Sequence, residues 1–278
     1  MNNSIIINKK INPFKKIIKV TGDKSLSIRW VLFSSLASGI SKADNLLLSE
    51  DVLAAIEAVK KLGIKVKFKD NKCLIHGAGI SGYKYKKNIT IDAKNSGTLG
   101  RLILGLLINT PYPIKIIGDQ SLSKRDFNRV AFPLSKFGAK FELNKNHGLP
   151  LKIFGTQQSN PIKYFEKKGS AQCKSSVIFA AMRTEGKTII KAKKSRNHTE
   201  LLCKYLKLPI KLRSKKNLDL IEVNKVKKIK PLNYKIPSDI SSGSFFIVLA
   251  SLVRNSELLV KDVNINPSRI GIITILRK

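Results

Sequence analysis

Four stretches of the chain share one pattern, a short polar start rich in Ser and Gly followed by a run of apolar residues. The stretches are GDKSLSIRWVLFSSLASG from Gly22, NSGTLGRLILGLL from Asn95, GSAQCKSSVIFAAM from Gly169 and SSGSFFIVLASLV from Ser241. Successive starts lie about 70 residues apart, a period typical of repeated supersecondary units. The pattern predicts four helices, each beginning at a polar turn.

A second helical pattern with a polar start follows each apolar run. It reads SEDVLAAIEAVKKLG, KRDFNRVAFPLSKFG, SRNHTELLCKYLKL and NPSRIGIITILRK in the four units. Pro133 removes a backbone donor inside the second of these, so we expect that helix to be kinked or short.

Short β-branched or alternating runs between the helices predict strands at 65–68, 88–91, 114–117, 187–190 and 258–260. Each unit therefore mixes two helices with several strands, and a unit of this size must pack on its neighbours to close a core. The pattern predicts an α/β fold built from packed repeats.

The composition is typical of a folded protein whose partners are negatively charged. Hydrophobic residues make up 42% of the 278 residues, enough for a core, and 53 Lys+Arg against 18 Asp+Glu give a net charge of +35. Nucleic acid, membrane headgroups and anionic metabolites are the partners such a charge favours. Because the lysines are spread along the chain and aromatic residues are only 7%, a compositional bias explains the charge better than a specific nucleic-acid face.

The chain carries no sign of export or membrane insertion. Its first 20 residues lack a long apolar core, and the apolar run 245–253 is half of what a spanning helix needs. Three cysteines, far apart and odd in number, form neither a disulfide framework nor a paired-cysteine metal site. We expect a cytoplasmic protein with no membrane partner.

The polar helix starts are candidate anion sites, because free backbone N–H groups and the helix dipole both favour negative charge there. Lys24, Ser25 and Arg29 stand at the first start, and Arg29 follows Ser25 by one helical turn. The other starts offer Gly97 and Thr98 before Arg101, the run 169–172, Lys124-Arg125 and the carboxylate of Asp239. Taken alone, each also fits an ordinary capped helix.

Other chemistries find no support. Neither a Walker A loop nor a G-x-G-x-x-G helix start occurs, and the three histidines have no metal-ligand spacing. Cys173 lies in an apolar helix, where packing is a better explanation than nucleophilic catalysis.

Taken together, the segments resemble the 5-enolpyruvylshikimate-3-phosphate synthase family (3-phosphoshikimate 1-carboxyvinyltransferase). The matching stretches, in the family's order, are GDKSLSIR, NLLLSEDVLAAIEAVKKLGI, NSGTLGR, GDQSLSKR, GSAQCKS, SRNHTE, IPSDISSGSFF and NPSRIG. The resemblance implies six βαβαββ repeats, three per domain, in an inside-out α/β barrel of the enolpyruvyl transferase type. By that pattern, 21–236 form a complete three-repeat domain that binds shikimate 3-phosphate, and 1–20 with 237–278 form an incomplete second domain.

The resemblance also implies an activity, the transfer of the enolpyruvyl group of phosphoenolpyruvate to the 5-hydroxyl of shikimate 3-phosphate, in the shikimate pathway of aromatic amino acid biosynthesis. Two small anionic substrates and no metal or organic cofactor are implied, in a family that is usually monomeric. Shikimate 3-phosphate is expected at Lys24, Ser25, Arg29, Ser170, Ala171, Gln172 and Ser195, and phosphoenolpyruvate at Lys24, Gly97, Arg125 and Gln172. Asp239 matches the family's proton-accepting aspartate.

Three departures from the family pattern qualify this expectation. Asp126 stands where the family often has Pro, and Asn197 where it usually has Asp. The family's second acid/base carboxylate lies in repeats beyond Lys278, so we expect a C-terminally truncated chain that binds shikimate 3-phosphate at best.

Four other functions remain open at this stage. A UDP-N-acetylglucosamine enolpyruvyl transferase commonly has Cys in the loop corresponding to 118–125, which this chain lacks. An RNA 3′-phosphate cyclase needs a nucleotide-reactive His, and none of the three fits. A basic nucleic-acid binder would ignore shikimate 3-phosphate, and an inactive remnant would bind it without turnover.

Overall fold

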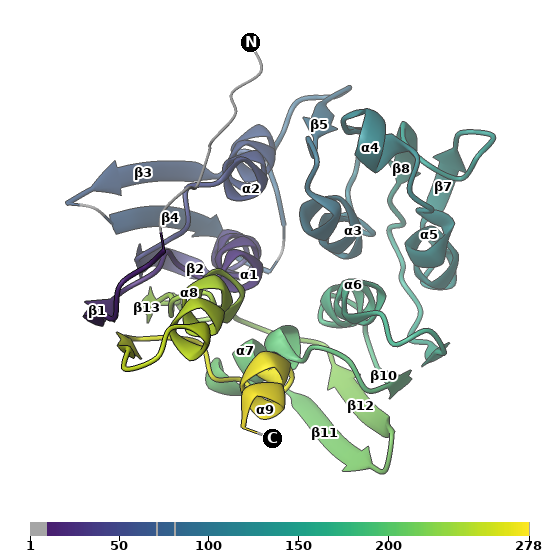
Figure 1. The fold of residues 1–278 in the computed structure, drawn as a ribbon. Coiled ribbons are helices and arrows are strands. Elements are labelled where there is room, and N and C mark those ends of the chain that lie inside the picture. The colour runs from purple at the N-terminus through teal and green to yellow at the C-terminus, as the bar shows by residue number, and fades with distance from the viewer. Residues whose placement is uncertain (1–9, 71, 81, 278) are drawn as a thin grey trace. The chain divides into compact units, whose positions relative to one another are not determined.

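A computed structural model describes residues 10–70, 72–80 and 82–277 (Figure 1). The chain divides into two compact units, a large unit, Lys24–Ile236, and a small unit, Met1–Asp23 with Pro237–Lys278. Residues 1–9 and Lys278, which belong to the predicted second domain, lie outside the described residues. What each unit binds stays a prediction.

The large unit contains three copies of a βαβαββ repeat, which confirms the predicted fold class. The first repeat comprises β13 (Tyr234–Lys235), α1 (Lys24–Ser35), β2 (Ser38–Asp44), α2 (Glu50–Lys61), β3 (Lys65–Lys69) and β4 (Lys72–Ala78). The second comprises β5 (Thr90–Asp92), α3 (Gly97–Leu106), β6 (Ile114–Ile117), α4 (Gln120–Ser123), α5 (Asn128–Ser135), β7 (Lys140–Leu143) and β8 (Leu151–Phe154). The third comprises β9 (Lys163–Glu166), α6 (Ala171–Ala181), β10 (Lys187–Lys193), α7 (His198–Tyr205), β11 (Ile210–Lys215) and β12 (Leu218–Asn224).

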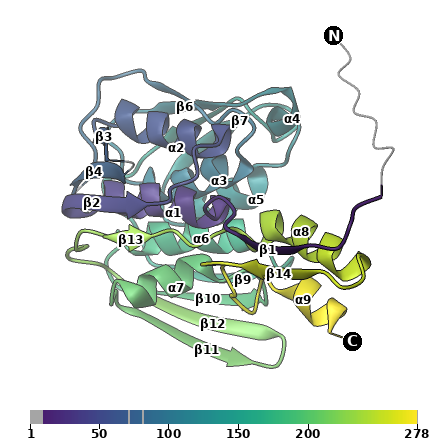
Figure 2. The same cartoon turned by 60° about the vertical axis from the view of Figure 1, so that its left-hand side comes forward.

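Each repeat has its own four-stranded sheet, and the three sheets share one topology. Their orders are β13-β2-β4-β3, β5-β6-β8-β7 and β9-β10-β12-β11, with the first pair parallel and the other two antiparallel. Burial alternates along β10, so one sheet face covers the core and the other meets solvent. Figure 2 shows β11 and β12 of the third sheet as a long hairpin.

The first helices of the repeats, α1, α3 and α6, lie side by side inside the large unit, and the sheets lie outside them (Figure 1). Ten consecutive residues of α1, eight of α3 and nine of α6 are buried. A helix that is buried on all sides needs apolar or small residues all round, and this explains the apolar runs in the sequence. At Gly105 a side chain would collide with the backbone, since an added Cβ would lie 2.1 Å from the carbonyl oxygen of Ser176 on α6.

The first repeat takes its first strand from the far end of the large unit. In β13, Tyr234 and Lys235 pair in parallel with Ala43 and Asp44 of β2. The indole of Trp30 is fully buried on α1 and donates a hydrogen bond to the carbonyl oxygen of Leu232, at 2.9 Å. The returning segment therefore closes the ring of three repeats.

The second repeat contains a strand and a helix whose boundaries differ from those expected. The strand predicted at 88–91 is β5, two residues later, because Asn88 has a φ of 60° and cannot start a strand. The helix predicted from Lys124 begins at Asn128, and the separate turn α4 precedes it. As predicted for a helix with Pro133 inside it, α5 is short, with eight residues.

The small unit repeats the first part of this plan. It contains β1 (Lys15–Ile18), α8 (Ile240–Leu252), β14 (Glu257–Val260) and α9 (Gly271–Leu276), with β1 and β14 paired in parallel. Its order, βαβα, is that of the first four elements of a repeat, and the described residues include no counterpart of the two final strands.

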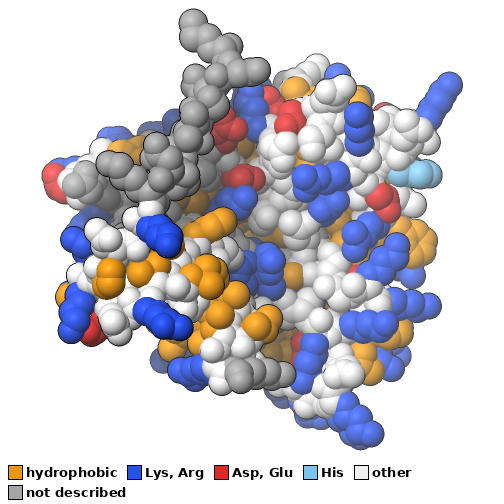
Figure 3. Space-filling model, in the orientation of Figure 1, with side chains coloured by type: hydrophobic (Ala, Val, Ile, Leu, Met, Phe, Trp, Pro, Cys, Tyr) orange, Lys and Arg blue, Asp and Glu red, His pale blue; other side chains and the backbone are white. Residues whose placement is uncertain are grey.

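The helix α8 is apolar like α1, α3 and α6, but most of its residues are half-buried or exposed. Of its residues only Ile240 and Gly243 are buried, whereas Phe245 is 79% and Leu252 77% exposed. Figure 3 shows apolar side chains gathered over α8 and α9. Lys and Arg side chains are instead scattered over the visible face. None of the described helices combines the length and the apolarity needed to cross a membrane.

Two phenylalanines of similar helices test this contrast. Phe179 of α6 is fully buried, with its ring 4.8 Å from that of Phe33. We expect Phe179→Ala to lower the free energy of unfolding of the large unit by about 3–5 kcal/mol. Phe245 belongs to the small unit, and the matched variant Phe245→Ala should change the free energy of unfolding of that unit by less than about 0.5 kcal/mol. Urea unfolding followed by circular dichroism measures both, and equal losses would contradict the assignment of the core.

The same contrast predicts hydrogen exchange rates. Amides of α8 lie in a helix with few buried contacts, so we expect them to exchange faster than those of α1, α3 and α6. Hydrogen–deuterium exchange with mass spectrometry resolves the peptides, and equal protection of α8 and α6 would contradict this prediction.

Candidate active site

The polar first turns of α1, α3 and α6 are connected by side-chain hydrogen bonds. On α3, Arg101 donates through Nη1 to Oε1 of Gln172 on α6, at 2.5 Å. The Nε2 atom of Gln172 donates to Oγ1 of Thr98, at 3.1 Å. Gln172 is thus held by two residues of the neighbouring repeat, in the first turn of its own helix.

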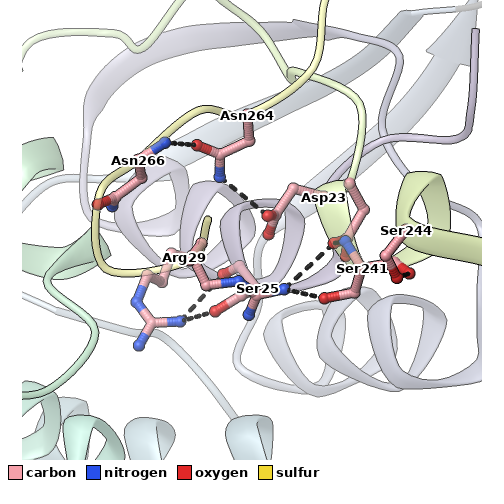
Figure 4. Close-up of polar contacts among 9 residues, drawn as sticks. Asp23, Ser25, Arg29, Ser241, Ser244, Asn264 and Asn266 are labelled. Carbon is pink, nitrogen blue, oxygen red and sulfur yellow. Dashed lines mark hydrogen bonds and ion pairs between the residues drawn. The ribbon is translucent and has the colours of Figure 1, made fainter. Parts of the chain in front are cut away.

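A second set of bonds joins α1 to the third repeat. The guanidinium of Arg29, which is 2% exposed, donates from Nε to Oγ1 of Thr199 at 2.7 Å and from Nη2 to Oγ of Ser175 at 3.3 Å. Its Nη1 donates to the Oγ and the carbonyl oxygen of Ser25, at 2.6 and 3.0 Å (Figure 4). Because Ser175 lies one turn after Gln172 on α6, both sets of bonds meet on the same helix.

Arg125 reaches this region through a turn fixed by Asp119. The Oδ1 of Asp119 accepts from the backbone N–H of Leu122 at 2.7 Å, and Oδ2 accepts from Nδ2 of Asn95 at 2.5 Å. These two donors lower the pKa of Asp119. The bonds tie the turn that carries Arg125 to the loop before Gly97, where an added Cβ would lie 3.1 Å from Nη1 of Arg125.

Cationic side chains lie close together around Gly97. Among the residues that the structure describes, Arg101 has no acidic side-chain partner. A Cβ added at Gly97 would lie 3.5 Å from Nη1 of Arg101, and the side chain of Arg101 is mostly buried. Burial lowers the pKa of Arg101, and the nearby charges of Arg129 and Arg125 lower it further. The Nε of Arg101 is buried and has no hydrogen-bond partner in the described part of the chain. A bound anion would relieve this repulsion and accept these donors.

The start of α6 is shaped by a buried carboxylate. Ser170 caps the helix by accepting from the backbone N–H of Cys173, at 3.3 Å, and its own N–H donates to Glu166 at 2.7 Å. Ala171 is the first residue of α6. These bonds fix the turn that presents Ser170 and Gln172.

The remaining predicted site residues lie in three places. Lys24 opens α1, and its ammonium lies 3.0 Å from the carboxylate of Asp51 on α2. Ser195 precedes α7, and its hydroxyl is buried without a hydrogen-bond partner among the residues described. Thr199, four residues later, contacts Arg29. Ser195 therefore lies in the segment that leads to the Arg29 set of bonds.

Asp239 belongs to the small unit. It caps α8, and its Oδ1 accepts from the N–H of Ser241 at 2.8 Å and from Nη2 of Arg269 at 3.2 Å. In the same unit, Asn264 donates to the carboxylate of Asp23 at 3.0 Å (Figure 4).

Sequence reasoning singled out Lys24, Ser25, Arg29, Gly97, Arg125, Ser170, Ala171, Gln172, Ser195 and Asp239. The structure connects Ser25, Arg29, Gly97, Arg125 and Gln172 through the bonds and contacts above. It adds Ser175, Thr199 and Arg269, and it shows Thr98 and Arg101, which the sequence analysis named only as part of a helix start, bonded to Gln172. Arg101 follows Gly97 by four residues, the spacing that had linked Ser25 to Arg29, so helical periodicity could have assigned it.

The sequence of the chain matches the model of one protein family, EPSP synthase (3-phosphoshikimate 1-carboxyvinyltransferase), over residues 8–278. The chain belongs to this family. It is 40% identical to the 3-phosphoshikimate 1-carboxyvinyltransferase of Caldicellulosiruptor bescii over 98% of this chain and 63% of that protein. It is 38% identical to the enzyme of that name from Streptococcus agalactiae over 96% of this chain and 62% of that protein.

Structural similarity agrees with the sequence match. The EPSP synthase of Acinetobacter baumannii superimposes with a TM-score of 0.87 at 34% identity, covering 95% of this chain and 59% of that one. The chain therefore spans less than two thirds of the length of these relatives.

The cysteines near the EPSP synthase motifs give a chemical test. Burial raises the pKa of Cys73 to about 12 and also raises the pKa of Cys173 and of Cys203. A raised thiol pKa lowers the thiolate fraction at pH 8 below that of an ordinary cysteine, whose pKa is about 8.5. We expect iodoacetamide to modify none of the three within an hour at pH 8, and all three in 6 M guanidinium. Mass spectrometry counts the adducts, and rapid labelling of native Cys173 would contradict its role as a packing residue.

Proposed function

We propose that the protein takes part in the transfer of the enolpyruvyl group from phosphoenolpyruvate to the 5-hydroxyl of shikimate 3-phosphate. The reaction gives 5-enolpyruvylshikimate 3-phosphate and phosphate, a step of aromatic amino acid biosynthesis. Family membership supports this function. One observation on this chain supports it. Side chains near the starts of α1 and α3 form hydrogen bonds with Gln172 and Ser175 of α6, so polar residues of three repeats lie together.

Shikimate 3-phosphate would be held mainly by hydroxyls and amides of the large unit. Lys24 and Ser25, with Arg29 behind them, and Ser170, Ala171 and Gln172 are the groups we assign to it, together with Ser195. The hydroxyl of Ser195 is already desolvated and has no partner in the described residues, so a phosphate oxygen would satisfy it at little further cost.

Phosphoenolpyruvate would lie beside Gly97, where the guanidinium of Arg125 comes close to the backbone and Gln172 is within reach of Arg101. A fork-shaped guanidinium suits both a carboxylate and a phosphate. Asp239 would accept the proton of the attacking hydroxyl. Each of these roles is assigned by matching motifs, and the contacts above supply the geometry that favours them.

Binding of shikimate 3-phosphate without turnover is the second candidate function. It is favoured by one observation, that the groups assigned to shikimate 3-phosphate all lie in the large unit, whereas the chain spans 63% of a related enzyme. We further propose that the protein acts in the cytoplasm on free small molecules. Its oligomeric state stays a prediction, that of a monomer.

Isothermal titration calorimetry of the chain with shikimate 3-phosphate tests the proposed function. A charge-assisted hydrogen bond to phosphate contributes about 1.5–3 kcal/mol. We therefore expect shikimate 3-phosphate to bind roughly 10- to 150-fold more tightly than shikimate. Absence of heat with shikimate 3-phosphate would refute the assignment. Phosphate release when phosphoenolpyruvate is added identifies transfer, and its absence in a binding-competent chain identifies the second candidate.

The variant Gly97→Ala tests whether the two substrates bind at different parts of the site. Gly97→Ala places a carbon 3.1 Å from Nη1 of Arg125, so this flexible side chain must move. Because Gly97 opens α3, we expect the melting temperature to stay level or rise. The affinity for phosphoenolpyruvate, measured by calorimetry with shikimate 3-phosphate present, should fall at least tenfold. The affinity for shikimate 3-phosphate alone should change less than threefold, and a larger change would contradict the division of the site.

A further inference from the structure

The outer face of the third sheet is strongly cationic. Burial alternates along β9, β10 and β12, so every second side chain points away from the core, and the residues paired with these on β11 point the same way. The outward cations are Lys163, Lys187, Lys191, Lys193, Lys211, Arg213 and Lys215. Within these four described strands, Glu222 is the only outward carboxylate, and it lies 3.7 Å from Lys187. We call this surface the cationic sheet face.

The strand register arranges part of this face in a row that crosses the whole sheet. Phe165, Lys191, Leu220 and Arg213 lie directly opposite one another on β9, β10, β12 and β11. Because neighbouring strands lie about 4.8 Å apart, the row is roughly 14 Å long. Apolar and cationic side chains therefore alternate along one line on the surface.

The row borders a hollow of about 800 Å³ on the hairpin of β11 and β12, which Figure 2 shows. Among the residues that line it are four cations and two leucines, Lys191, Arg213, Lys215, Lys216, Leu218 and Leu220. In the register, Leu220 stands between Lys191 and Arg213. The hollow thus offers apolar surface flanked by positive charge, which suits a ligand that carries both flat apolar groups and anionic groups.

Phe165 adds an aromatic ring to the same face. The residue is 40% exposed, and the ammonium groups of Lys191 and Lys167 lie 5.1 and 5.9 Å from the centroid of its ring. An exposed ring can stack with a nucleobase, since every base has a flat π-face. The ammonium groups beside the ring lie where the phosphates of a stacked nucleotide could reach them.

The other two sheets of the large unit lack this combination. On the second sheet, Glu142 lies directly opposite Lys152, so an acid stands beside the cation. On the first sheet, Lys42 and Lys67 flank Leu74, and the described residues of that row include no aromatic side chain. The lysines are spread along the sequence, but strand pairing gathers them beside an aromatic ring on the third sheet.

We propose that the cationic sheet face binds single-stranded nucleic acid without sequence preference. The Lys and Arg side chains contact the phosphates, and Phe165 with the leucines of β12 contacts the bases. Proteins that bind single strands in this way combine a cationic surface with aromatic side chains for stacking. A membrane surface offers anionic headgroups but no bases to stack on Phe165. The inference does not rest on the proposed function, because these side chains point away from the core and from α6.

Fluorescence anisotropy of the full chain with a labelled single-stranded RNA of mixed sequence, about 16 nucleotides long, tests the proposal. The variant is Lys191→Gln/Arg213→Gln/Lys215→Gln. Each phosphate contact on a single strand contributes about 0.7 to the slope of log K against log salt concentration. We expect this slope to become shallower by about 2, and the Kd at about 0.1 M salt to rise at least tenfold.

The matched control removes three charges from the first sheet, in Lys65→Gln/Lys67→Gln/Lys69→Gln on β3. All three lysines are exposed. We expect the Kd for RNA to change less than twofold in this variant. Because both variants alter exposed side chains, their melting temperatures should stay near that of the unsubstituted chain. Equal weakening in the two variants would show that net charge alone drives binding, and would overturn the proposal.

Phe165→Leu separates stacking from charge. It removes the ring and keeps an apolar side chain, so we expect the Kd for single-stranded RNA to rise at least fivefold with an unchanged salt slope. The unsubstituted chain should bind a duplex of the same sequence less tightly, since its bases are already stacked. Equal or tighter binding of the duplex would overturn the proposal. So would a chain that does not bind the RNA at about 0.1 M salt, including one that sediments only with phosphatidylserine vesicles.

Discussion

The helices α1, α3 and α6 exclude water from one another along most of their length, and this packing determines what their ends can do. At Gly105 two of these helices are in backbone contact with no room for a side chain. Apolar and small residues therefore fill most of the interior, and the long polar side chains of these helices lie in their first two turns. Because the three helices share one packing arrangement, those turns meet, and Arg29, Arg101 and Gln172 come into contact with groups from neighbouring repeats.

Much of this architecture could be predicted from the sequence, because repetition is visible as apolar runs at a constant spacing. The two-residue strand β13 could not, since Tyr234 and Lys235 form no pattern and gain their role only from pairing with β2. In the same way, the Ser and Gly starts marked the site, but its internal contacts were invisible. Arg29 lies 170 residues from Thr199 in sequence, and only the closed ring of repeats brings them together.

The small unit shows what the same plan looks like without its neighbours. In the large unit, the apolar helices α1, α3 and α6 pack against one another, with the sheets outside them (Figure 1). In the described residues of the small unit, α8 is the one helix of this kind, and Phe245 and Leu252 remain in contact with solvent. The repeat plan thus explains why α8 is apolar, although Ile240 and Gly243 are its only buried residues.

The late position of β13 also has a consequence for biosynthesis. Ser41 of β2 accepts a hydrogen bond from the backbone N–H of Leu232, just before β13 and 191 residues later, so the ribosome has made β2 long before its partner strand exists. At a translation rate of about 5–20 residues per second, the edge of β2 stays unpaired for roughly 10–40 s in the nascent chain. An open edge of this kind is a template for incorrect strand pairing, so the first repeat is exposed to mispairing during its synthesis.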